Sequence, residues 1–296
     1  MRLLISGGTG FLGQHLLRLL AGEHVLYALA RSVQDRVGSE RVHWIAQDLT
    51  QPLDYQKLPA QIDGVLHLAQ SRHYREFPEM VEDILEVNIH GTLRLLEYAR
   101  KAKAQHFVYA SSGGVYGHSY EKFVETHPVN PLNFYLSSKY SSELFVANYR
   151  QFFCTSVLRC FFVYGPGQQG MLVSNLLSQV RDGKTVTIQG NPGIRINPIY
   201  VTDAARAFAA ALHTTAHGLF NVAGDETVTI TDLVQMIADA HGVHALLKYA
   251  EASGGDLMGD NAMMKSVLDV HPTVCLRDGV ASMVRSDSLA RGHAHA

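Results

Sequence analysis

The start of the chain joins a short apolar run to three glycines spaced by three residues. Residues 3–5 predict a buried strand, Gly7, Gly10 and Gly13 follow it, and the apolar pattern over residues 11–21 predicts a helix. A side chain at either of the first two glycines would block the tight turn and the approach of the backbone to a pyrophosphate. The third glycine allows close packing between helix and strand, and the helix N-terminus offers free N–H groups to the anion. An ordinary turn is the alternative, but the strand–turn–helix context predicts a dinucleotide site. Its expected residues are Gly7, Gly10, Phe11, Leu12 and Gly13.

Short apolar runs alternate with helical patterns along the first half of the chain. The runs are continuously apolar, as strands covered by helices on both faces should be, so the pattern predicts an α/β fold with a parallel sheet. The expected strands are residues 3–5, 25–30, 42–46, 64–68, 107–110 and 157–160, and the expected helices are 11–21, 78–103 and 134–152.

The pattern of elements changes after residue 164, where glycine and proline separate shorter segments. We therefore predict a Rossmann-type, doubly wound parallel sheet over residues 1–164 and a smaller C-terminal substrate-binding lobe over residues 165–296. Residues 195–215 are expected to pack back on the first domain. The expected elements of the second half are helices near 170–182, 203–213, 231–241 and 261–269, and strands at 199–201 and 220–222.

Charge and cysteine content exclude several classes of protein. The chain has 25 Lys and Arg against 27 Asp and Glu, whereas a nucleic-acid surface needs clustered positive charge. It has no apolar run near the roughly 20 residues that cross a membrane. Three cysteines without a CxxC pair fit a reducing compartment, so we expect a cytoplasmic protein. Despite 16 histidines we expect no metal, because His213 and His217 lack the glutamate of a HExxH site.

The residue after the second expected strand bears on which dinucleotide is bound. Arg31 lies 21 residues beyond Gly10, where an NAD site usually carries an acid for the ribose 2′-hydroxyl. An arginine there accommodates a 2′-phosphate, which favours NADP over NAD. The alternative is a solvated surface arginine.

A serine and a tyrosine–lysine pair suggest chemistry at the same sheet edge. Tyr135 and Lys139 are four residues apart on an expected helix, so they share one face. A nearby ammonium favours the phenolate, which predicts a lowered pKa for Tyr135. Ser111 and Ser112 end an expected strand, and that end of a parallel sheet faces the ligand crevice.

Taken together, these motifs resemble the extended short-chain dehydrogenase/reductases, which include NAD(P)-dependent sugar epimerases and dehydratases. The resemblance runs almost end to end. Its motifs are Gly7–Gly13, Asp48–Leu49, His67–Ala69, Val87–Thr92, Tyr109–Gly117, Tyr135–Lys139, Leu158–Arg159, Val163–Pro166, Arg195, Ile199–Asp203 and Phe220–Val222.

The resemblance implies a role for each matching residue. Ser112, rather than Ser111, would hydrogen-bond the reacting sugar hydroxyl or ketone, because it lies five residues before Gly117. Tyr135 would be the general acid/base, and Lys139 would bind the nicotinamide ribose and tune the tyrosine. Asp48 would contact the adenine amino group, and Asn88 would either brace the site or act in it. The remaining implied cofactor contacts are Leu49, Leu68, Ala69 and Gln70.

Two glycines narrow the implied chemistry. Where dehydratases of this family carry an Asp-Glu pair and the decarboxylases a glutamate, this chain has Gly113 and Gly114, which offer no side-chain proton. The cysteine of the 3,5-epimerising members is absent too. Hydride transfer at C4 of a nucleotide sugar remains, by a 4-epimerase or a 4-ketoreductase. The alternative is a catalytically silent dinucleotide-binding sensor or scaffold of the same fold.

The substrate end departs further from the family pattern. Phe162 stands where many members have an asparagine that touches the nucleotide-sugar phosphates, so that contact is in doubt. Arg195 matches a phosphate-binding arginine, with a structural arginine as the alternative. Residues 71–75 either reach the substrate or form a solvated loop.

A second copy of the chain is the expected protein partner. The helices at 78–103 and 134–152 resemble those that pair across a two-fold axis in this family, which implies a homodimer. Their apolar residues could instead face the sheet.

Overall fold

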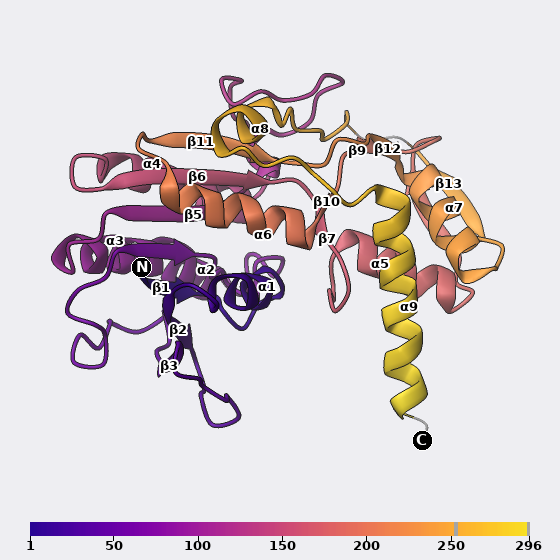
Figure 1. Cartoon of the computed structure of the whole chain (residues 1–296). Coiled ribbons are helices and arrows are strands. Elements are labelled where there is room, and N and C mark those ends of the chain that lie inside the picture. The colour runs from indigo at the N-terminus through magenta and orange to yellow at the C-terminus, as the bar shows by residue number, and fades with distance from the viewer. Residues whose placement is uncertain (252–253, 295–296) are drawn as a thin grey trace.

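A parallel sheet forms the centre of the molecule. The computed structural model describes residues 1–251 and 254–294 of the chain. Within them, seven parallel strands form one sheet in the order β11-β6-β5-β4-β1-β2-β3, and helices cover both of its faces (Figure 1). This confirms the predicted Rossmann-type α/β fold. The strands are β1 (Arg2–Ser6), β2 (Val25–Ala30), β3 (Val42–Ala46), β4 (Gly64–His67), β5 (His106–Ser112), β6 (Cys154–Cys160) and β11 (Gly218–Val222).

The two faces of the sheet bury separate apolar clusters. Leu3 and Ile5 of β1 join the cluster under α1 (Phe11–Leu20) and α6 (Val201–Ala210), whereas Leu4 joins the cluster under α3 (Gly91–Lys101) and α4 (Phe134–Asn148). All three side chains are fully buried. Successive side chains of a strand point to opposite faces, so a strand covered on both sides must be continuously apolar.

The helix expected over residues 78–103 is interrupted. The structure has α2 (Val81–Leu85), a π-helical turn η1 (Glu86–His90) and then α3. Hydroxyl groups of Thr92 and Ser142 both donate to the carbonyl oxygen of Asn88, at 2.6 and 2.8 Å. These two hydroxyls thus bind a carbonyl oxygen that would accept a backbone hydrogen bond in a regular α-helix. Short π-helical turns of this kind often occur at functional sites. The second expected helix ends at Asn148 rather than at residue 152.

Two elements from the second half of the chain return to the central sheet. Strand β11 pairs in parallel with β6, and α6 packs beside α1 through Ala204 and Phe208, both fully buried. The chain therefore crosses between the two halves more than once. The domain boundary at residue 164 stays a prediction.

The remaining elements lie beside the sheet, around a third apolar cluster (Figure 1). Leu276, Val280 and Val284 place one face of a long last helix in that cluster. The sequence analysis expected no helix beyond residue 269, so this helix was missed. These elements are β7 (Val163–Tyr164), α5 (Leu172–Arg181), β8 (Val186–Gln189), β9 (Arg195–Ile196), β10 (Ile199–Tyr200), β12 (Val228–Thr229), α7 (Ile230–His241), β13 (Leu247–Ala250) and α9 (Leu276–Ala294). Helix α8 (Ala262–Leu268) packs instead on the central sheet, where Met264 and Leu268 join the cluster under α1 and α6.

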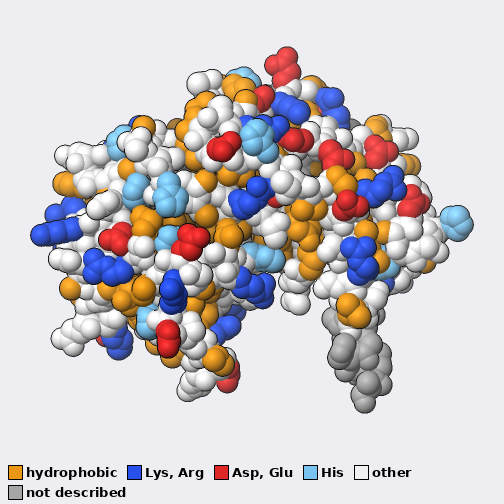
Figure 2. All heavy atoms as spheres, in the orientation of Figure 1, with side chains coloured by type: hydrophobic (Ala, Val, Ile, Leu, Met, Phe, Trp, Pro, Cys, Tyr) orange, Lys and Arg blue, Asp and Glu red, His pale blue; other side chains and the backbone are white. Residues whose placement is uncertain are grey.

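The molecular surface carries charges of both signs. Figure 2 shows basic and acidic side chains interspersed over the visible face, in line with the nearly balanced composition. Within residues 1–251 and 254–294, no helix is long and apolar enough to cross a membrane. In the same residues, no three His, Cys, Asp or Glu side chains are grouped so as to hold a metal ion.

Candidate active site

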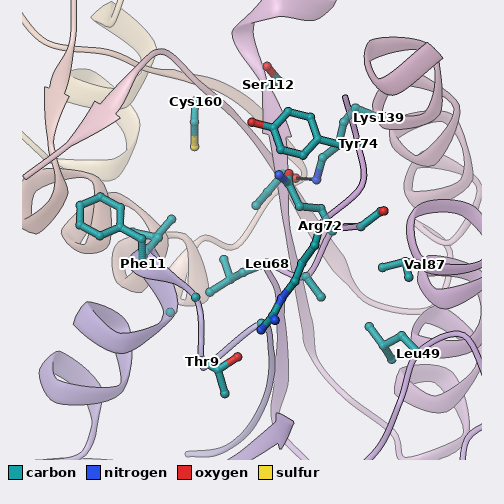
Figure 3. A pocket seen from close by; sticks show the side chains of 18 of the residues that line it. Thr9, Phe11, Leu49, Leu68, Arg72, Tyr74, Val87, Ser112, Lys139 and Cys160 are labelled. Atoms are coloured by element: carbon teal, nitrogen blue, oxygen red, sulfur yellow. Dashed lines mark hydrogen bonds between the residues drawn. The ribbon is translucent and has the colours of Figure 1, made fainter. Parts of the chain in front are cut away.

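A cavity of about 1080 Å³ opens at the carboxyl ends of the central strands (Figure 3). Its lining comes mainly from the segments that follow β1, β2, β3, β4, β5 and β6, and from α4. The strand order reverses between β1 and β4, and ligands of such open sheets bind at that crevice. All sequence-predicted site residues except Asn88 and Arg195 line this cavity.

The glycine loop is shaped by close backbone contacts. Gly7 has a φ of +75°, and a Cβ there would lie 2.7 Å from the backbone nitrogen of Ala69. A Cβ on Gly13 would lie 2.2 Å from the carbonyl oxygen of Gly7. Gly10 caps α1 without a side-chain hydrogen bond, so the first N–H groups of the helix face the cavity unblocked. This geometry suits a pyrophosphate.

The far end of the cavity has the groups expected around an adenosine. Oδ1 of Asp48 accepts hydrogen bonds from the backbone nitrogen and the hydroxyl of Thr50, both at 3.0 Å, which fixes the carboxylate. Arg31 lines the cavity after β2. Sequence reasoning missed Arg36, which also lines it, with its guanidinium carbon 5.4 Å from the ring centre of Trp44.

Ser112, Tyr135 and Lys139 meet in the middle of the cavity. Ser112 is the last residue of β5. Helix α4 begins at Phe134 because the side chain of Asn133 caps it, accepting from the nitrogen of Leu136 at 2.9 Å. Tyr135 and Lys139 then lie one turn apart. The Lys139 ammonium donates to the carbonyl oxygen of Ala110 at 2.9 Å, which holds it beside β5.

Burial dominates the electrostatics of this pair. It lowers the pKa of Lys139 to about 8 and raises the pKa of Tyr135, and the neighbouring Tyr74 raises the latter further. Both shifts disfavour the charged form, as desolvation does. The sequence analysis predicted a lowered pKa for Tyr135, and that prediction was wrong because burial raises this pKa more than the Ser112 hydrogen bond and the Arg75 charge lower it.

A buried ion pair separates the two neighbouring serines. The Ser111 hydroxyl donates to Glu143, whose carboxylate also binds Arg159 at 2.6 Å, and all three residues are buried. Ser111 is therefore tied into the core beneath the site. Both serines line the cavity, and the Ser112 hydroxyl accepts instead from the backbone nitrogen of Gly114 at 3.2 Å.

Asn88 braces the site from outside the cavity. Its Oδ1 accepts from the nitrogen of Ser71 and its Nδ2 donates to the hydroxyl of Ser138, both at 2.9 Å. The asparagine thus connects the segment after β4 to α4, between Tyr135 and Lys139. Of the two roles that the resemblance left open, this contact set fits the bracing role.

The two remaining residues of the predicted substrate site, Phe162 and Arg195, are placed differently. Phe162 lines the cavity with a φ of +47°, a left-handed conformation that asparagine adopts more easily than phenylalanine. Arg195 lies outside the lining, where its guanidinium binds the carboxylate of Asp256 at 2.7 Å and its Nη2 also donates to the carbonyl oxygen of Tyr120.

The segment after β4 lines the cavity as well. Figure 3 shows the Arg72 side chain running through the cavity towards Thr9 of the glycine loop. The ring of Tyr74 lies 4.8 Å from that of Tyr135 between centroids. Arg75 donates to the carbonyl oxygen of Gly170 at 2.9 Å, which joins this segment to the opposite wall. Ser71, Arg72, Tyr74 and Arg75 thus line the cavity, and whether this segment reaches the substrate stays a prediction.

Comparison with known proteins identifies the family. A model of the NAD-dependent epimerase/dehydratase family matches residues 3–223. The chain belongs to this family. The match spans β1 to the end of β11, so it includes the glycine loop and all three residues of the Ser112, Tyr135 and Lys139 set. It confirms the resemblance seen in the sequence.

The chain is similar to curated family members whose activities differ from one another. It is 29% identical to UDP-glucose 4-epimerase of Mycolicibacterium smegmatis over 308 residues, covering 96% of this chain and 97% of that protein. It is 27% identical to dTDP-D-glucose 4,6-dehydratase of Homo sapiens over 262 residues, covering 81% of this chain and 75% of that protein.

Solved structures of family members share the whole fold. UDP-glucuronic acid 4-epimerase from Bacillus cereus, in complex with UDP-glucuronic acid and NAD, has a TM-score of 0.88 and 27% identity, covering 98% of this chain and 100% of that chain. UDP-glucose 4-epimerase of Thermus thermophilus, in complex with NAD, has a TM-score of 0.82 and 27% identity, covering 97% and 98%.

Replacing Gly13 with alanine should disturb the glycine loop. The new Cβ would clash with the carbonyl oxygen of Gly7, so we expect the free energy of unfolding to fall by about 1–3 kcal/mol. NAD binding should weaken as well, because the loop must shift. Denaturant unfolding and titration with NADH fluorescence measure the two effects. Gly22→Ala is the matched control, since a Cβ there meets no atom within 4 Å. Equal behaviour of the two variants would contradict the structural role given to Gly13.

Proposed function

We propose that the protein is an NAD(P)-dependent 4-epimerase of a nucleotide sugar. The observation that carries this proposal is the meeting of Ser112, Tyr135 and Lys139 in one cavity with the glycine loop. Family membership supports it, as do the solved 4-epimerases whose complexes hold NAD, one of them with a nucleotide sugar.

The residues of the cavity fit a dinucleotide. The N-terminus of α1 would hold the pyrophosphate, Asp48 the adenine amino group, and Lys139 the nicotinamide ribose. A nicotinamide bound there would supply the acceptor for a hydride from the sugar carbon and, once reduced, the donor that returns it. A side chain at Gly7 or Gly13 would clash with the backbone, so both positions leave the N–H groups of the loop open to phosphate oxygens.

The protein's own groups would handle the proton and position the sugar. Tyr135 takes the proton from the C4 hydroxyl as the ketone forms and returns it when the hydroxyl is restored. Ser112 hydrogen-bonds the same oxygen from the end of β5. Lys139 is held against β5 by Ala110, where its positive charge favours the phenolate that Tyr135 becomes.

The shape of the site disfavours dehydration and decarboxylation. A Cβ on Gly113 would lie 2.6 Å from the ring of Phe161, and one on Gly114 would lie 2.9 Å from Leu136. Apolar side chains therefore fill the space in which the dehydratases of the family would need an Asp-Glu pair. We accordingly propose epimerisation, or a net ketone reduction at C4, in preference to the activity of the dehydratase relative.

The substrate contacts proposed besides Ser112 are Phe162 and Arg195. Phe162 supplies an apolar wall in the cavity. For Arg195 to bind a substrate phosphate, its ion pair with Asp256 has to open or be shared. Arg75, which lines the cavity beside Tyr74, is a further cation on the substrate side.

We also propose that the protein is a cytoplasmic homodimer. Leu85 on α2 and Leu144 on α4 expose 38% and 49% of their surfaces, on helices that resemble the paired helices of family dimers. The thiols of Cys154, Cys160 and Cys275 are free, as expected in a reducing compartment.

The activity is tested with Tyr135→Phe. UDP-glucuronic acid and UDP-glucose are incubated with NAD, and nuclear magnetic resonance of the products detects the 4-epimer. We expect turnover by the wild type and a loss of roughly 10²–10⁴-fold in the variant, with NAD still bound, because only the transferable proton is removed. Tyr55→Phe, outside the cavity lining, is the control. Absent turnover in the wild type would favour the silent sensor, and a steady loss of reduced-nicotinamide absorbance with a 4-keto sugar would favour the ketoreductase.

Cofactor choice is tested at the adenosine end. We propose that Arg31 and Arg36 allow NADP to bind as well as NAD, through charge-assisted hydrogen bonds to the 2′-phosphate. Arg31→Asp should weaken NADPH binding about 10- to 100-fold relative to NADH, by loss of one such bond. Fluorescence titration of both cofactors measures this ratio, with Arg18→Asp as the control outside the cavity. An unchanged ratio of the two affinities would indicate that Arg31 is a solvated surface residue that does not contact the cofactor.

The dimer is tested at the exposed side chain of α4. A carboxylate at position 144 would be desolvated between two copies, so Leu144→Asp should elute as a monomer of 32.6 kDa in size-exclusion chromatography while the wild type elutes at twice that mass. Leu246→Asp, at a leucine that is also half exposed but lies outside these helices, should leave the mass unchanged. A monomeric wild type would refute the proposed dimer.

A further inference from the structure

The hydroxyl of Tyr135, the proposed catalytic tyrosine, binds a side chain that has no part in the proton transfer proposed above. Tyr135 donates to Oε1 of Gln70 at 3.0 Å. Gln70 follows β4 by three residues and lines the cavity. The sequence interpretation placed Gln70 only against the cofactor. The contact instead joins the strand that carries the glycine-loop contacts to the start of α4.

The other groups around Tyr135 do not replace this acceptor. The Lys139 ammonium is bonded to the carbonyl oxygen of Ala110, and the Cys160 thiol faces the tyrosine from the end of β6. Tyr74 packs on the ring, with the Arg75 guanidinium carbon 5.0 Å from the Tyr74 ring centre.

Two further polar groups lie near the same ring. The Ser112 hydroxyl lowers the pKa of Tyr135 through a hydrogen bond, and Tyr135 in turn raises the pKa of the buried Tyr109. Of all these groups, Gln70 is the one whose carbonyl accepts the Tyr135 proton.

On the basis of the proposed function, we infer that Gln70 is a positioning residue for Tyr135. Its amide carbonyl holds the Tyr135 hydroxyl at the reacting end of the cavity and keeps the proton on the phenol oxygen. A carbonyl acceptor stabilises the neutral phenol and repels the phenolate. The same amide carries an N–H₂ group, so a rotation of the side chain would let it donate to the phenolate once the proton has left. Gln70 therefore sets how readily Tyr135 changes from acid to base.

Two substitutions at Gln70 should move the titration of Tyr135 in opposite directions. Gln70→Leu removes the acceptor at similar volume, so the pKa of Tyr135 should fall by about half to one unit, the equivalent of one hydrogen bond. Gln70→Glu adds a negative charge to the acceptor, so the pKa should rise by at least as much. A residue that only packs against Tyr135 would not produce shifts of opposite sign.

The titration is followed in protein labelled with ¹³C at the tyrosine ring and saturated with NAD⁺. The Tyr135 resonance is assigned from its absence in Tyr135→Phe, and the pH dependence of its shift is compared in the wild type and both Gln70 variants. Gln61→Glu, an exposed glutamine outside the cavity lining, is the control for added charge and should leave the curve unchanged. Thermal unfolding and NADH titration show that each variant is folded and holds cofactor.

Opposite shifts support the inference, and they do so whether or not UDP-glucose or UDP-glucuronic acid is turned over. Absent turnover with opposite shifts would refute the proposed 4-epimerase while the link between Gln70 and Tyr135 stands. Identical curves for the three proteins, including curves that stay protonated throughout, would overturn the inference. So would shifts of the same sign.

Discussion

The close approach between the glycine loop and the segment after β4 constrains the rest of the site. A Cβ on Gly7 would lie 2.7 Å from the nitrogen of Ala69, so the two backbones touch with no side chain between them. One residue further along, Gln70 reaches the hydroxyl of Tyr135. The glycine loop and the residue that binds the Tyr135 hydroxyl thus belong to one continuous contact. A shift of the glycine loop would therefore disturb both the proposed pyrophosphate site and the segment that holds the Tyr135 hydroxyl.

Burial at the centre of the site disfavours the charged forms of Lys139 and Tyr135, both of which the proposed mechanism needs. The pKa of Lys139 falls to about 8 and the pKa of Tyr135 rises, because each loses water when its charged form is buried. At neutral pH the resting pair is therefore a protonated lysine, close to losing its proton, and a neutral phenol. In this state Tyr135 is ready to act as an acid. In the proposed mechanism, its action as a base would be helped by nearby positive charge, which a bound oxidised nicotinamide would add.

Local pattern predicted most of the sheet, and contacts distant in sequence account for what was missed. Continuous apolar runs predicted β2 and β3 at their observed bounds. Spacing placed Tyr135 and Lys139 on one helix face, whereas the family resemblance selected Ser112, and all three line the cavity. The π-helical turn was not predictable, because it depends on a hydroxyl from α4 that binds the carbonyl of Asn88. The predicted direction of the Tyr135 pKa shift was wrong for a related reason, since residue spacing reveals a neighbouring charge but not how deeply a side chain is buried.

The substrate half of the site shows why the remaining roles were hard to read from the sequence. Phe162 keeps a left-handed backbone that suits the asparagine of many family members, so the turn survives although the polar group is gone. Arg195 keeps its place in the motif, but a carboxylate 61 residues away holds it. Meanwhile Arg75, from the loop after β4, reaches across to the carbonyl of Gly170. That bond joins the two walls of the cavity beside Tyr74, whose ring lies on Tyr135. A substrate anion that bound Arg75 would compete with this bond, so anion binding and the contact between the walls would depend on each other at the place where the tyrosine acts.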